Sequence, residues 1–101
     1  MQIVWDPVAV EQLRKNQTVL ELETFQVNEK SVTAYCVVPA DKILSEMAQL
    51  PNYIELHEGF VKAFKDSNYT LCRDIAEHLM GKFGGELDTY YKEILSRIQN
   101  G

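Results

Sequence analysis

His57 and its acidic neighbours are the group in this sequence that comes nearest to a metal site. A usable site needs three or four ligands that converge on one ion. Successive residues of a helix lie about 100° apart around its axis, so Glu58 points away from His57 and Glu55 points further away. The segment also lacks the HExxH spacing. We therefore predict no metal and no other cofactor, and interpret His57 as a partly buried histidine with a hydrogen-bond partner.

The two cysteines, Cys36 and Cys72, are the next candidates for chemistry. A reactive thiol needs exposure and positively charged surroundings. Cys72 instead lies near the centre of an apolar helical stripe, with Arg73 pointing away from it, and Cys36 alternates with apolar residues of a predicted strand. We predict that both are free thiols that pack in the core.

The glycine-rich run Gly81–Gly85 superficially resembles a phosphate-binding loop. It lacks the Gly-x4-Gly-Lys-Ser/Thr pattern, and it follows a predicted helix rather than a strand. Glu86 and Asp88 also occupy the first turn of the next helix, where they would repel a bound anion. We interpret the run as a helix turn, in which Gly84 and Gly85 end the preceding helix because glycine adopts a left-handed backbone at little cost.

Glu21 and Glu23 are the acidic pair that invites a general acid–base interpretation. Such catalysis needs carboxyl groups that are held across a cleft. Two residues apart on a strand, the pair is expected to share one solvated face. We predict no catalytic residues. A small enzyme whose site is assembled from distant residues is kept as an alternative, because such a site leaves no local motif.

Aromatic residues at the edges of the predicted core indicate a contact surface for another protein. Tyr35 is expected on the open face of the sheet, Tyr69 just before a helix, and Tyr90 beside the apolar stripe of the last helix. The open face and this helical edge are two candidate surfaces. Together they contain the predicted protein-binding residues Glu21, Glu23, Thr33, Tyr35, Val37, Tyr69 and Tyr90.

The elements that must position these residues begin with a short strand at Gln2–Trp5. A short helix follows, with Asp6 as its N-cap and Pro7 at its first position. The pattern Ile-Val-Trp-Asp-Pro-x-Ala-x-x-x-Leu over residues 3–13 resembles the opening strand and helix of the RelE/ParE-type toxins, which are directed at the ribosome or gyrase. Those toxins are usually basic and their sheet follows their helices, whereas this chain is acidic and its helices come last. The family's activity is therefore not carried over.

Two β-branched segments, Thr18–Val27 and Ser31–Val38, predict a β-hairpin. In the first segment, the apolar residues Leu20 and Leu22 are at even-numbered positions, whereas Phe25 and Val27, which follow Glu23, are at odd-numbered positions. In a regular strand, the two pairs would therefore lie on opposite faces. This change indicates either a bulge or a strand that changes its buried face.

The second half of the chain is predicted to be helical. Asp41 is expected to cap a helix that Pro51 interrupts, and Asn52 with Glu55 resembles a capping box for the next helix. A helical hairpin follows, because apolar residues recur at steps of three and four before and after the glycine run. The apolar stripes of these helices are Ile43, Leu44, Met47 and Leu50; Tyr53, His57, Phe60, Val61 and Phe64; Leu71, Ile75, Leu79 and Phe83; and Leu87, Tyr91, Ile94, Leu95 and Ile98.

The composition of the 101 residues, 46% of them apolar, is typical of a folded domain. Strands cluster early and helices late, so we predict a single α+β domain over residues 1–101. In it, helices cover a small antiparallel sheet, made of the N-terminal strand and the β-hairpin, and the chain ends in a helical hairpin.

The charge balance restricts the partners. Ten Lys and Arg residues against fifteen Asp and Glu give a net charge of −5. This disfavours nucleic acid, because phosphate binding rests on clustered cations, and it favours a basic partner. No signal peptide, membrane-spanning run or disulfide framework is visible, so we expect a cytoplasmic protein that does not bind a membrane.

We therefore predict a non-enzymatic, cytoplasmic protein-interaction module. Its partner would bind either to an edge strand or to the open face of the sheet. An immunity or antitoxin-type protein that neutralises a basic toxin is an alternative, as is the small enzyme named above. Homo-oligomer formation is left open.

Overall fold

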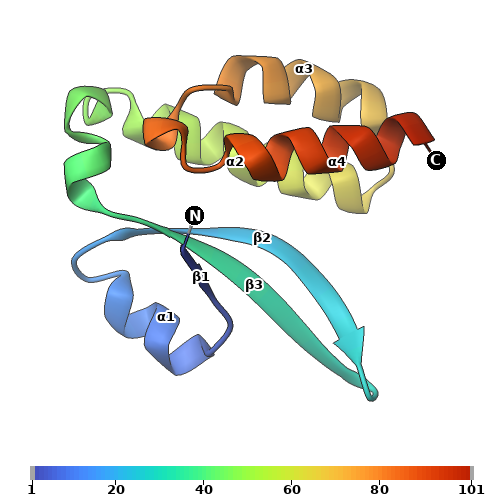
Figure 1. Cartoon of the computed structure of the whole chain (residues 1–101), viewed down its shortest axis with the longest axis horizontal. Helices are drawn as coiled ribbons and strands as arrows, with labels where there is room; N and C mark the ends of the chain where they lie inside the picture. The colour runs from blue at the N-terminus through green and yellow to red at the C-terminus, as the bar shows by residue number, and fades with distance from the viewer. Residues whose placement is uncertain (1, 101) are drawn as a thin grey trace.

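The architecture is α+β, as predicted. A computed structural model describes residues 2–100 of the chain. Three antiparallel strands form a sheet in the order β1–β3–β2, with β1 at Gln2–Val4, β2 at Thr18–Val27 and β3 at Lys30–Val38. Three longer helices form a layer on one face of this sheet, and one short helix lies against the other face (Figure 1).

A β-bulge interrupts the pairing of β2 with β3. Glu21 pairs with Tyr35 and Glu23 pairs with Ala34, so Leu22 is the extra residue. The insertion places Phe25, which pairs with Val32, on the same face of the sheet as Leu20. Of the two explanations for the change in the apolar pattern, the bulge is therefore correct.

Helix α1 (Pro7–Leu13) starts as predicted, because the Asp6 side chain accepts a hydrogen bond of 3.0 Å from the Val8 amide. It covers part of the sheet face that was expected to be open. Val10 of α1 packs against Val19 and Val37 in a small second core. The prediction of a fully open face is wrong, because α1 turns back beneath β2 and β3 and buries its own apolar stripe there (Figure 1).

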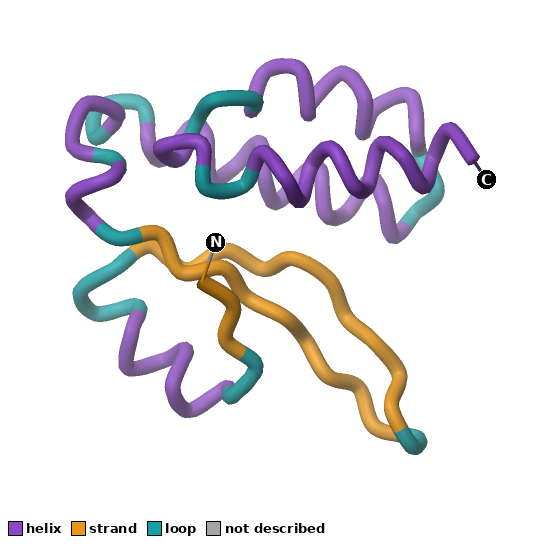
Figure 2. Tube along the Cα trace, viewed as in Figure 1, coloured by secondary structure: helices purple, strands orange, loops and turns teal. Residues whose placement is uncertain are grey.

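The helical layer consists of α2 (Leu50–Lys65), α3 (Tyr69–Leu79) and α4 (Asp88–Asn100). Helix α3 packs against the other two on the side away from the sheet (Figure 2). The C-terminal helical pair is thus present. The helical layer and the sheet enclose the main core, whose fully buried members include Cys36, Phe60, Cys72, Leu79, Phe83, Leu87 and Tyr91.

The helix expected after Asp41 is replaced by two 3₁₀ turns, η1 (Ala40–Lys42) and η2 (Leu44–Glu46). Leu44 and Met47, which the predicted stripe placed in the core, are exposed. Pro51 lies in the first turn of α2, where proline needs no amide hydrogen, so it begins a helix and does not interrupt one. The predicted capping box is also wrong: Asn52 lies inside α2, and its side-chain amide donates to Gln49.

Helix α3 ends at Leu79, one turn earlier than predicted. Gly81, with φ of 80°, is the left-handed residue that follows the helix, so Gly84 and Gly85 are not its stop. Phe83 instead begins a further 3₁₀ turn, η3 (Phe83–Gly85), and is fully buried there. Leu71, expected in the apolar stripe of α3, is partly exposed.

The Glu46 carboxylate joins two of these turns. Its two oxygens accept hydrogen bonds of 2.9 Å from the backbone amides of Phe83 and Gly84. This contact ties η2 to η3 across a long stretch of sequence and fixes the connection from the sheet to the helical layer.

Candidate protein-interaction site

The β-bulge is held by side chains of the helical layer. The Glu21 carbonyl accepts a hydrogen bond from His57 Nε2 of α2, and the Leu22 carbonyl accepts one of 2.8 Å from the Tyr90 hydroxyl of α4. Because a carbonyl only accepts, the His57 proton lies on Nε2. Nδ1 then accepts a hydrogen bond of 2.8 Å from the Tyr91 hydroxyl. Both ring nitrogens of His57 are therefore engaged.

Burial controls the ionisation of this cluster. His57 is only 1% exposed, so it is more deeply buried than predicted, and its two hydrogen bonds confirm that it is a hydrogen-bonded histidine on the apolar face of α2. Burial lowers the pKa of His57 below its usual value, and the hydrogen bond to the Glu21 carbonyl opposes the shift only in part. Burial also raises the pKa of both Tyr90 and Tyr91, so the cluster is neutral at neutral pH.

We expect the protein to lose stability as the pH falls below about 6.5. The pKa of His57 is lower in the folded protein than in the unfolded chain, so the unfolded chain binds the proton first. The stabilisation that depends on neutral His57 is therefore complete above the pKa that histidine has in the unfolded chain. It is lost as the pH falls toward the lower pKa of His57 in the folded protein. Urea unfolding between about pH 7.5 and about pH 5 should show this decline, before most carboxylates titrate.

His57→Gln should remove most of this pH dependence, although the variant is less stable throughout. His78→Gln is the matched control, because His78 is exposed on α3 and its Nδ1 bonds the Asp74 carbonyl of the same helix. An unchanged pH dependence in His57→Gln would assign the effect to other groups.

A groove of about 630 Å³ runs beside the bulge, between the first half of β2 and α2. We call it the β2 groove. Its floor contains His57, Ile54 and Val61, which continue the apolar face of α2. At one end, the Lys65 ammonium bonds the Glu21 carboxylate at 2.9 Å. The remaining lining residues are Arg14, Gln17, Thr18, Val19, Leu20, Glu58, Lys62 and Asp66.

The outer edge of β2 lies along this groove. Among the described residues, β2 pairs with β3 alone, so its other edge has no strand beside it. An unpaired edge presents backbone amide and carbonyl groups that another strand can bond. At the bulge, His57 and Tyr90 already occupy the carbonyls of Glu21 and Leu22. The backbone groups of the β2 edge are thus available to another strand in two short stretches, one on each side of the bulge.

The predicted acidic rim does not exist as one surface. Glu21 and Glu23 lie on opposite faces of the sheet, because the bulge falls between them and not after them. Glu21 faces Lys65 of α2, whereas Glu23 bonds the Arg97 guanidinium of α4 at 2.8 Å. The expectation that both carboxylates share a solvated face is wrong.

The other predicted binding residues are also dispersed. Val37 is fully buried beneath α1, and Tyr35 is partly covered, with the Arg14 guanidinium 5.9 Å from its ring centre. Thr33 bonds Thr24 of the neighbouring strand at 2.9 Å. Of the predicted binding residues, Glu21 alone lines the β2 groove.

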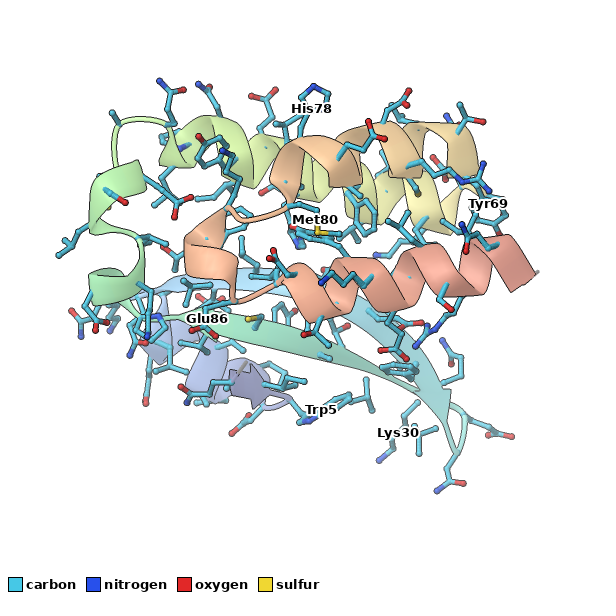
Figure 3. The ribbon with its side chains drawn as sticks, turned by 45° about the horizontal axis from the view of Figure 1, so that its top comes forward. Trp5, Lys30, Tyr69, His78, Met80 and Glu86 are labelled. Atoms are coloured by element: carbon cyan, nitrogen blue, oxygen red, sulfur yellow. The ribbon has the colours of Figure 1, made fainter. Side chains whose placement is uncertain are left out.

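The second predicted surface, at Tyr69 and Tyr90, is not continuous. Tyr69 is partly exposed at the start of α3 (Figure 3), whereas Tyr90 is buried and directs its hydroxyl to the bulge. The apolar spacing predicts that Val61 and His57 share a helix face, but it does not indicate that this face lies against β2. The β2 groove was therefore missed, because no local pattern indicates which strand a helix contacts.

Both cysteines are buried free thiols, as predicted. Burial raises the pKa of Cys36 to about 11 and also raises that of Cys72. Neither thiol is therefore available as a thiolate at neutral pH. Within residues 2–100, no three His, Cys, Asp or Glu side chains come together in a way that would hold a metal ion.

Comparison of the chain with known protein families, with curated proteins and with solved structures finds no match. None of the described helices has both the length and the apolar character that a membrane crossing needs. The interpretation of the β2 groove therefore rests on its own geometry.

Proposed function

We propose that this protein is a protein-interaction module, not an enzyme, and that it binds a short extended segment of a partner in the β2 groove. The observation that supports this proposal is the unpaired edge of β2 beside the groove of about 630 Å³. In strand addition, main-chain hydrogen bonds supply affinity, and pockets for alternate side chains supply specificity. Both components are present here: the edge supplies the first, and the apolar floor at Ile54 and Val61 supplies the second.

The partner segment has a definable chemistry. Alternate side chains of an added strand would point toward α2, so the segment should carry apolar residues at every second position. The groove itself has both signs of charge, with Lys62 and Lys65 near Glu58 and Asp66. The chain as a whole carries −5, which would steer it toward a basic partner protein.

A binding role agrees better with the groove than a catalytic one. A general base must offer a free nitrogen or oxygen to the substrate. His57 lies at the floor of the groove, yet its Nε2 donates to the Glu21 carbonyl and its Nδ1 accepts from Tyr91. We also propose that the protein acts in the cytoplasm, and its two buried free thiols are compatible with a reducing compartment.

We expect the module to select short peptides from a displayed random library and to bind them through their backbone. The test is N-methylation of each amide of a selected peptide in turn. Methylation at alternate positions should weaken binding about tenfold or more, because it removes strand hydrogen bonds, whereas methylation between them should have little effect. A peptide that tolerates methylation at every position would contradict strand addition.

A pair of charge reversals locates the site. Glu58→Lys changes an exposed residue of the groove, and Glu77→Lys makes the same change on the exposed face of α3. A basic peptide should bind the first variant more weakly than the second at moderate salt. Equal affinities for both variants would move the binding site away from the β2 groove.

A further inference from the structure

A second surface lies at the far end of the β-hairpin, away from the β2 groove. Trp5 and Phe25 are 49% and 37% exposed, and their ring centres lie 5.9 Å apart. Ile3 and Val27, which are 43% and 50% exposed, extend the same surface. We call these four residues the hairpin patch. Contiguous exposed apolar side chains of this kind mark interaction sites.

The register of the sheet explains why the hairpin patch is uncovered. Phe25 pairs with Val32, and Ile3 pairs with Cys36, so both lie on the face that the helical layer covers elsewhere. The hairpin bends away from α4 toward its turn (Figure 1), and the helices do not reach this end. Apolar side chains that continue the main core are therefore left at the surface.

We propose that a second copy of this chain covers the hairpin patch, in a two-fold symmetric contact between the two hairpin ends. The charge of the hairpin end favours a second copy over a basic partner. Residues 24–33 contain one acidic residue and one basic residue, Glu29 and Lys30, so this end is neutral in a chain of net charge −5. Two copies can approach here without like-charge repulsion, and a basic partner gains no attraction.

The hairpin patch also has complementary groups at separate positions. Lys30 pairs with Val27 beside the hairpin turn, whereas Trp5 lies on the far side of Phe25, its ring centre 5.9 Å from that of Phe25. Figure 3 shows Trp5 and Lys30 at the side of the molecule opposite α3 and α4. A two-fold contact brings Lys30 of each copy to Trp5 of the other, where the ammonium can lie over the aromatic ring.

The size of the surface determines the strength of the dimer. The exposed parts of the four side chains offer on the order of 300 Å² of apolar surface, against about 800 Å² per partner in a standard interface. The hairpin patch therefore supplies the centre of the contact, and the strand edges and turns supply its rim. A weak dimer, with a dissociation constant in the micromolar range or above, follows from this size.

Trp5 provides a direct test, because it is the only tryptophan of the chain. Sedimentation from about 1 to about 500 µM should show a monomer–dimer equilibrium, which is the range expected for a small interface. Over the same range, the emission of Trp5 should move to shorter wavelength as its ring leaves water. The protein needs no partner or peptide for this measurement, so its outcome is independent of binding in the β2 groove.

Val27→Lys should weaken the dimer at least about tenfold and abolish the emission shift. Leu44→Lys is the matched control, because Leu44 is also an exposed apolar residue but lies on η2. Urea unfolding of each variant verifies that the fold is intact. A protein that stays monomeric throughout, a dimer that Val27→Lys leaves unchanged, or dimerisation without an emission shift would each overturn the proposal.

Discussion

Gly84→Ala is expected to destabilise the protein by about 2–4 kcal/mol, a large share of the stability of a small domain. Two effects add. With φ of 65°, Gly84 has a left-handed backbone that costs alanine about 1 kcal/mol. The new Cβ would also lie 2.6 Å from the Lys42 carbonyl oxygen, which belongs to the backbone of η1 and cannot simply rotate away. Relief of this contact would separate η3 from η1 and disturb the amides that bind Glu46.

Gly81→Ala is the matched control for this substitution. Gly81 has a similar φ of 80°, but a Cβ there meets no atom within 4 Å. This variant should lose only the stability that the left-handed backbone costs alanine, about 1 kcal/mol. Free energies of unfolding from urea titrations give the difference between the two variants. Equal losses would mean that the close approach of Gly84 to Lys42 does not contribute.

Cys72→Asp is expected to cost about 3–5 kcal/mol, because it places a carboxylate in the core without a cation beside it. Cys72 is fully buried, and its thiol lies 3.8 Å from the Phe60 carbonyl oxygen, which would repel a carboxylate. Burial alone accounts for the raised pKa of the native thiol. The pKa of the introduced carboxyl should also rise, so the loss should be complete at neutral pH and shrink as the pH falls toward 4.

Three further variants separate the causes of this loss. Cys72→Ala tests the missing sulfur alone and should cost about 1 kcal/mol. Cys72→Asn keeps the shape of the new side chain without its charge. Arg73→Asp places the same residue one position along, where the helix is exposed, and measures the intrinsic effect of aspartate on α3. Urea unfolding in which Cys72→Asp loses no more than Arg73→Asp would place Cys72 outside the core.

The elements with strong local signals were predictable from the sequence. The N-cap at Asp6, the hairpin and the apolar stripe of α4 all follow from patterns that neighbouring residues complete. The segments predicted wrongly are those that long-range contacts determine. Phe83 continues the stripe of α3 by spacing, yet Glu46, far away in sequence, binds its amide and holds it in a separate turn.

The candidate sites were less predictable for a related reason. A bulge was one of the two explanations predicted for the change in the apolar pattern after Glu23, but its actual position, between Glu21 and Glu23, depends on which residues of β3 they pair with. A shift of one residue exchanges the two faces of a strand, so the two carboxylates do not share a face and the predicted acidic surface does not form. The coverage of Val37 by α1 likewise depends on how the chain turns after Trp5, which no periodicity specifies.

The engagement of the bulge carbonyls by His57 and Tyr90 also has a consequence for aggregation. A fibril grows when identical chains add, one after another, to a long uninterrupted strand edge. Here two side chains from the helical layer divide the edge of β2 at its middle, so a short segment can bind while a growing stack of strands cannot extend along it.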